Sequence, residues 1–184
     1  MRNPQRRIIL VDQDGVLADY QGKLLEILKR EHPHKQWLPL TALTEHDIEK
    51  NYPPEYADIL EEIVLRKGFY LSLEPIAGGK EALEHLLALG HDVRICTAPK
   101  REHTFCVPEK LAWIDRYLGR KWTERTIITR DKTLIHGDIL IDDKPGITGV
   151  CQPSWEQIFY DQPYNHRYEK RRLTWVNYKE VLAL

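Results

Sequence analysis

Two aspartates separated by one residue, Asp12 and Asp14, directly follow the apolar run at residues 8–11. A carboxylate can attack phosphorus as a nucleophile, a second one can transfer a proton, and both can bind a cation. An isolated Asp-x-Asp after a strand is more often a turn former or a helix cap. The pair indicates chemistry only if other parts of the chain supply matching groups.

Such groups follow three further apolar stretches. Thr97 comes after residues 93–96, Lys132 comes shortly after residues 126–129, and Asp142 and Asp143 end the stretch that begins at residue 138. Taken singly, the threonine could be a cap, the lysine a solvated charge and the acidic pair a turn. Their joint occurrence at four strand ends favours one shared site.

Phosphoryl transfer explains this combination of side chains. A phosphate monoester is a dianion and repels a carboxylate nucleophile unless a cation intervenes. Mg²⁺ prefers oxygen ligands, which Asp12 and the pair Asp142 and Asp143 can supply. The Thr97 hydroxyl and the Lys132 ammonium suit the remaining phosphate oxygens. Asp14 is then free to give its proton to the leaving oxygen.

A parallel sheet would bring these groups together, because its strands all end at the same edge. Residues 8–11 are too short for a buried helix and rich in β-branched side chains, which predicts a buried parallel strand with a turn at Gly15. Further strands are expected near 91–96, 126–129, 138–141 and 155–160, and helices near 19–30, 78–89, 108–118 and 176–184. This alternation predicts a three-layer, doubly wound α/β fold, in which ligands bind outside the carboxyl ends of the strands.

The segment between the first strand and the next helix differs in character. Prolines interrupt residues 31–54, Thr44 with Asp47 resembles a helix start, and a helix is expected from Pro54 to near Gly68. We therefore predict an α/β core at residues 1–19 and 73–184 and an inserted helical cap at residues 20–72.

Composition limits the partners. The 184 residues carry a net charge of −1, so no overall field attracts a nucleic acid polymer or a membrane surface. No apolar run approaches the ~20 residues that a membrane span needs. Three cysteines without a Cys-x-x-Cys pair make structural disulfides unexpected. These features predict a cytoplasmic protein with a small-molecule partner.

The four motifs together resemble those of the haloacid dehalogenase-like phosphatases. The closer resemblance is to the 5'(3')-deoxyribonucleotidase branch. It rests on the phrases Asp-Gly-Val-Leu-Ala-Asp at 14–19, Gly-Phe-Tyr at 68–70, Thr-Arg-Asp-Lys-Thr at 129–133 and Ile-Asp-Asp-Lys at 141–144. The resemblance implies a Rossmann-like core and an Mg²⁺-dependent hydrolase that removes phosphate from nucleoside monophosphates through an aspartyl-phosphate.

The resemblance also implies roles for individual residues. Asp12 is the nucleophile, and Asp14 is first the acid and then the base. The implied metal ligands are Asp12, the main-chain carbonyl of Asp14 and the acidic pair, with Asp143 preferred over Asp142. The implied phosphate contacts are Thr97, Ala98, Lys110, Arg130 and Lys132, and the aromatic residues expected beside the base are Tyr20, Phe69 and Tyr70.

This chain departs from the branch at two positions. Ala98 stands where a serine is common, which leaves only a backbone N–H for the phosphate, and Val64 stands where an aromatic residue is expected. Base and sugar preference stay open, as does the oligomeric state, with a homodimer among the options. The alternatives are a phosphatase for another small phosphomonoester and a non-catalytic relative that binds metal or nucleotide. The intact acid at Asp14 favours an enzyme, because a binding protein has no use for it.

Overall fold

The computed structural model describes residues 6–184; residues 1–5, which open the predicted core segment, lie outside the described part. Strands of these residues form one parallel sheet in the order β3-β2-β1-β4-β5-β6. The strands are β1 (Ile8–Val11), β2 (Asp92–Thr97), β3 (Thr126–Ile128), β4 (Ile139–Asp142), β5 (Glu156–Tyr160) and β6 (Arg172–Leu173). The predicted parallel α/β sheet is confirmed, and β6 is a strand that the sequence patterns did not indicate.

The helices largely fall where the patterns placed them. They are α1 (Tyr20–Glu31), α2 (Ala57–Leu65), α3 (Gly79–Ala88), α4 (Cys106–Tyr117), α5 (Arg120–Thr123) and α6 (Tyr178–Val181). The closing helix expected over 176–184 is wrong in length, since only α6 is helical. A short 3-10 helix, η2 (Ile48–Asn51), does begin directly after the helix start predicted from Thr44 and Asp47, but the Asp47 side chain makes no capping hydrogen bond.

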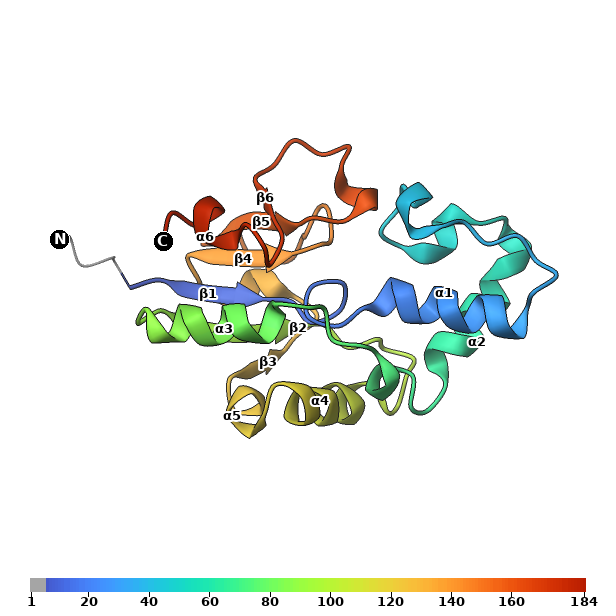
Figure 1. Cartoon of the computed structure of the whole chain (residues 1–184), viewed down its shortest axis with the longest axis horizontal. Coiled ribbons are helices and arrows are strands. Elements are labelled where there is room, and N and C mark those ends of the chain that lie inside the picture. The colour runs from blue at the N-terminus through green and yellow to red at the C-terminus, as the bar shows by residue number, and fades with distance from the viewer. Residues whose placement is uncertain (1–5) are drawn as a thin grey trace.

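The register of the sheet places the carboxyl ends of β1, β2 and β4 next to one another. Val11, the last residue of β1, pairs with Ile95 of β2 on one side and with Ile141 of β4 on the other. The residues that follow these three strands therefore leave the sheet at the same edge (Figure 1). The helices α1 and α2 lie beyond this edge (Figure 1).

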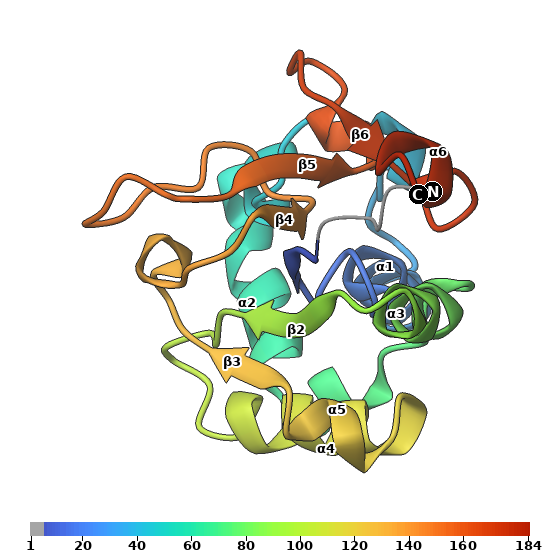
Figure 2. The same ribbon diagram turned by 90° about the vertical axis from the view of Figure 1, so that its left-hand side faces the viewer.

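The two faces of the sheet are covered unequally. Ile9 and Val11 point into a large core that includes side chains of α3, α4 and α6, whereas Leu10 points into a small cluster with Cys96, Leu140 and Trp155. The small cluster is closed by a 3-10 helix, η5 (Lys132–Leu134), and by the loop between β4 and β5 instead of a long helix (Figure 2). The indole N–H of Trp155 donates to the Lys132 carbonyl at 3.3 Å, which holds η5 against this cluster.

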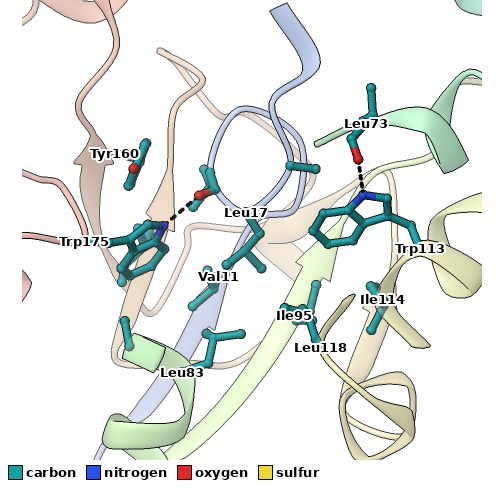
Figure 3. Close-up of a cluster of buried hydrophobic side chains, with 14 of the residues drawn as sticks. Val11, Leu17, Leu73, Leu83, Ile95, Trp113, Ile114, Leu118, Tyr160 and Trp175 are labelled. Atoms are coloured by element: carbon teal, nitrogen blue, oxygen red, sulfur yellow. Dashed lines mark hydrogen bonds between the residues drawn. The ribbon is translucent and has the colours of Figure 1, made fainter. Parts of the chain in front are cut away.

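Two buried tryptophans fix the chain segments that border this edge (Figure 3). The indole N–H of Trp175 donates to the carbonyl of Val16 at 2.8 Å, and that of Trp113 donates to the carbonyl of Leu73 at 2.8 Å. Both indoles are buried in the large core. The loop after β1 and the segment that returns from α2 are thus anchored by side chains on distant elements.

The predicted division into a core and a cap at residues 20–72 stays a prediction. Within residues 6–184, none of the helices has the length and apolarity that crossing a bilayer would require.

Candidate active site

The loop after β1 carries the first two acids. The Asp12 N–H donates to the Ile141 carbonyl at 2.9 Å, which extends the pairing of β1 with β4. Gly15 then turns the chain with a φ of 72°, in the left-handed region that glycine adopts most readily. A side chain at this position would collide with the carboxylate of Asp143. Glycine therefore permits both the turn and the close approach of the two acidic loops.

Lys132 links two of the carboxylates. Its Nζ lies 2.9 Å from Oδ1 of Asp12 and 2.6 Å from Oδ2 of Asp142. Burial alone would lower the pKa of Lys132, but the two carboxylates outweigh burial and raise it. The ammonium is therefore a permanent positive charge beside Asp12, and it offsets part of the charge of the acidic cluster.

Asp12, Asp142 and Asp143 form the acidic cluster, with one oxygen of each lying within 4.8 Å of the others. Both oxygens of Asp142 are already engaged, one by Lys132 and one by the N–H of Lys144 at 2.9 Å. Asp143 accepts the hydroxyl of Tyr164 on Oδ2, but its Oδ1 is buried and has no partner among the described residues. A buried carboxylate oxygen without a partner is costly, and a cation would satisfy it.

Burial governs the acidity of Asp143. Desolvation raises its pKa to about 7; nearby His46 opposes this shift, and the charges of Asp142 and Asp12 add to it. The same burial raises the pKa of Tyr164, which keeps the phenol protonated as the donor to Asp143. The site thus places several carboxylates where water does not solvate them. A divalent cation would offset their mutual repulsion.

Asp14 lies in a separate part of the site. Its Oδ2 accepts from Nζ of Lys110 at 2.6 Å, and the same ammonium lies 2.9 Å from Oγ1 of Thr97. Burial raises the pKa of Asp14, while Lys110 opposes the shift. Because the pKa of Asp14 is raised overall, this carboxyl group carries a proton more readily than an exposed aspartate, as a general acid requires.

These groups face a cavity of about 380 Å³ at the sheet edge. Most of the predicted site residues line it, namely Asp12, Asp14, Tyr20, Tyr70, Thr97, Ala98, Arg130, Lys132, Asp142 and Asp143. Two of them do not: Lys110 lies behind Asp14 and Thr97, and Phe69 packs edge-on against Tyr20 with ring centroids 5.3 Å apart. Val64 is buried in the large core and does not line the cavity either.

Several residues of the site were not indicated by the sequence. His46, in the loop before η2, lines the cavity and lies 3.8 Å from Asp143. Tyr164 and Asn165 belong to a 3-10 helix, η6 (Pro163–Asn165), and Asn165 donates to the Asp143 carbonyl at 3.0 Å. No hydrophobic periodicity marks either segment, so only the tertiary structure reveals their positions.

Solved structures share this fold. The chain superimposes on a HAD family hydrolase from Deinococcus radiodurans, described with bound phosphate and sodium, with a TM-score of 0.63 over 97% of this chain and 95% of that chain. It also superimposes on a hydrolase from Streptococcus pneumoniae with a TM-score of 0.50 over 96% and 98% of the two chains. At sequence identities of 16% and 13%, these two similarities support the fold and nothing further. The fold is that of the HAD-like hydrolases, as the motifs predicted.

Sequence relatives identify the family within the HAD-like hydrolases to which this chain belongs. The chain is 45% identical to a Bordetella pertussis protein named "Putative 5'(3')-deoxyribonucleotidase", over 96% of this chain and 95% of the relative. It is 37% identical to the human 5'(3')-deoxyribonucleotidase, cytosolic type, over 95% and 92%. The model of the 5' nucleotidase, deoxy (pyrimidine), cytosolic type C family matches residues 6–184. This chain belongs to that family of hydrolases, and the predicted resemblance is confirmed.

Proposed function

We propose that the protein is an Mg²⁺-dependent phosphomonoester hydrolase that removes phosphate from (deoxy)nucleoside monophosphates. The observation that carries this proposal is the arrangement around Asp12. One of its oxygens is held by Lys132, and the side chain opens on the cavity beside the unpartnered Oδ1 of Asp143. The family membership supports the same reaction class.

The residues present fit a hard divalent cation. Asp12 and Asp143 would hold Mg²⁺ with their side chains and Asp14 with its main-chain carbonyl, while Asp142 keeps Lys132 in place. When bound, the ion supplies positive charge that lets a phosphate dianion approach the carboxylates. Oxygen-only ligands suit Mg²⁺ better than a softer transition metal.

In the first step, a carboxylate oxygen of Asp12 attacks phosphorus, and the bond between phosphorus and the nucleoside oxygen breaks. Asp14 donates its proton to the departing oxygen, for which its raised pKa is suited. Lys132, the Thr97 hydroxyl, the Ala98 N–H and Arg130 hold the phosphate oxygens. The product of this step is an aspartyl-phosphate on Asp12 and a free nucleoside.

In the second step, a water molecule attacks the phosphorus of the aspartyl-phosphate. Asp14, now a carboxylate, accepts a proton from that water, and the bond between phosphorus and Asp12 breaks. Inorganic phosphate leaves and both acids return to their starting states. The two aspartates therefore have different duties and are not interchangeable.

The size of the cavity and its aromatic walls support a nucleotide substrate. About 380 Å³ lies within the range of pockets for small ligands, and the rings of Tyr20 and Tyr70 lie 6.1 Å apart on the wall formed by the predicted cap. Relatives named as cytosolic and mitochondrial enzymes exist in humans. We assign this chain to the cytoplasm, where nucleoside monophosphates are available.

A panel of nucleoside and sugar monophosphates with Mg²⁺ tests the proposal. We expect the wild type to release phosphate fastest from a nucleoside monophosphate and Asp12→Asn to release none. Asp115→Asn, a matched change at an exposed position of α4, should behave as wild type. Faster hydrolysis of a sugar phosphate would favour another phosphomonoester as substrate. No hydrolysis of any compound would instead favour a non-catalytic binding protein.

A further inference from the structure

Gln21 is a cavity residue to which the reaction above gives no role. It is the second residue of α1, whose start is capped by Asp19 through a 2.9 Å bond from the Gly22 N–H. The side chain is only 7% exposed, and it lines the cavity together with Tyr20 and Tyr70. It therefore belongs to the part of the cavity wall that the predicted cap supplies.

The amide of Gln21 has no protein partner within residues 6–184, since none of the hydrogen bonds there involves its side chain. The neighbouring case of Gln13 differs, because its amide nitrogen donates to the Lys110 carbonyl at 3.3 Å. The amide atoms of Gln21 are not among the fully enclosed, unsatisfied atoms of the described chain. The amide atoms therefore keep some exposed surface, and Gln21 is one of the residues that line the cavity.

A nearly buried amide that is left without a partner is unfavourable unless water or a ligand satisfies it. The primary amide presents a donor and an acceptor side by side. A nucleobase edge also places a donor next to an acceptor, and flipped bases are read in this way between aromatic side chains. A sugar phosphate that lacks a base offers no such edge.

We propose that the Gln21 amide hydrogen-bonds the base of the bound nucleotide and so determines preference for nucleotides over sugar phosphates. This inference rests on the proposed function, because it takes the phosphate to lie at Asp12 and Thr97. The part of the substrate beyond the phosphate then extends toward the wall that carries Gln21. The rings of Tyr20 and Tyr70 flank that space.

Binding measurements in the Asp12→Asn background test the inference without turnover. Calorimetric titration with Mg²⁺ present gives Kd for thymidine 5'-monophosphate and for 2-deoxyribose 5-phosphate, which share the sugar and the phosphate. Adding Gln21→Met, which keeps chain length and bulk, should raise Kd for the nucleotide about tenfold. Kd for the sugar phosphate should stay within about twofold. Gln152→Leu, at an exposed loop position, serves as the matched control.

Three results would overturn the inference. The Gln21→Met change could weaken both ligands equally, which indicates a structural role, or it could weaken neither. The parent could also bind the nucleotide no more tightly than the sugar phosphate, which means that the base is not recognised. None of these results concerns the hydrolysis panel, so failure of the inference and failure of the proposed function are distinguished.

Discussion

The ammonium of Lys110 lies 2.6 Å from the carboxylate of Asp14 and 2.9 Å from the hydroxyl of Thr97, and it does not line the cavity. Lys110 is a buried residue of α4, so its ammonium contacts Asp14 and Thr97 from the protein interior. The sequence resemblance implied that Lys110 holds phosphate. Its contacts support a second duty, which is to set the charge and the orientation of Asp14.

Replacing Lys110 with methionine should lower kcat by about 10- to 100-fold, because Asp14 loses its orienting partner. Burial already raises the pKa of Asp14 and Lys110 opposes this, so the variant should raise that pKa further. With p-nitrophenyl phosphate, whose leaving group needs no acid, kcat depends on Asp14 acting as a base. The acidic limb of the pH profile should therefore move to higher pH. An unchanged limb would contradict this role, and Lys29→Met, an exposed change in α1, is the control.

Glu109, the neighbour of Lys110 in α4, fixes the backbone of Tyr70, which lines the cavity. Its buried carboxylate accepts from the backbone N–H of Gly68 at 2.5 Å and of Tyr70 at 3.2 Å. Glu109→Ala should lower the free energy of unfolding by roughly 2–4 kcal/mol, because one buried and one half-buried backbone donor lose their partner. It should also raise KM for nucleotides more than it lowers kcat, since Tyr70 shifts.

Denaturant titration and steady-state kinetics measure these two effects. Glu109→Gln keeps the volume and one acceptor oxygen, so its effects should be intermediate. Glu102→Ala removes an exposed glutamate near the start of the same helix and should change neither quantity. If Glu109→Ala lowers kcat and leaves KM unchanged, the carboxylate does not act through the cavity wall.

Asp143 should make the stability of the metal-free protein depend on pH. Burial raises its pKa from 3.8 to about 7, so the folded state binds this proton more tightly than the unfolded state does. The free energy of unfolding should therefore fall as pH rises between about 4 and 7, and this contribution is fully lost above about 7. The loss between pH 5 and pH 7 should be of order 2 kcal/mol.

Urea unfolding in EDTA at several pH values measures this slope, and Asp143→Asn should reduce it. Added Mg²⁺ should stabilise the wild type more at pH 7.5 than at pH 5, because the metal requires the ionised carboxylate. Equal slopes in the wild type and the variant would show that Asp143 does not carry the proton.

Much of the candidate site at this sheet edge could be predicted because it depends on local signals and on the geometry of parallel sheets. Each apolar run ends in a polar residue, and parallel pairing of β2, β1 and β4 necessarily brings Thr97, Asp12 and Asp142 together. Lys132 is also placed by this logic, since η5 begins only four residues after the end of β3. Strand periodicity and motif spacing were therefore sufficient to predict that these residues lie together, and their roles stay a prediction.

The rest of the site depends on contacts that local patterns do not encode. His46 lies in a segment without hydrophobic periodicity, and Tyr164 reaches Asp143 only because the chain after β5 folds back over the acidic loop. Gln21 follows an ordinary helix start, and its lack of a partner is visible only once its surroundings are known. β6 has two residues, too few for any strand pattern.

In the proposed reaction Asp12 is the nucleophile and Asp14 activates the water of the second step. Acid quenching of Asp14→Asn protein during turnover of p-nitrophenyl phosphate with Mg²⁺, followed by peptide mass spectrometry, tests it most directly. We expect a burst of nitrophenol equal to the enzyme concentration and one phosphoryl group on the peptide that carries Asp12. Simultaneous release of nitrophenol and phosphate without that phosphopeptide, or a phosphoryl group on another residue, would contradict it.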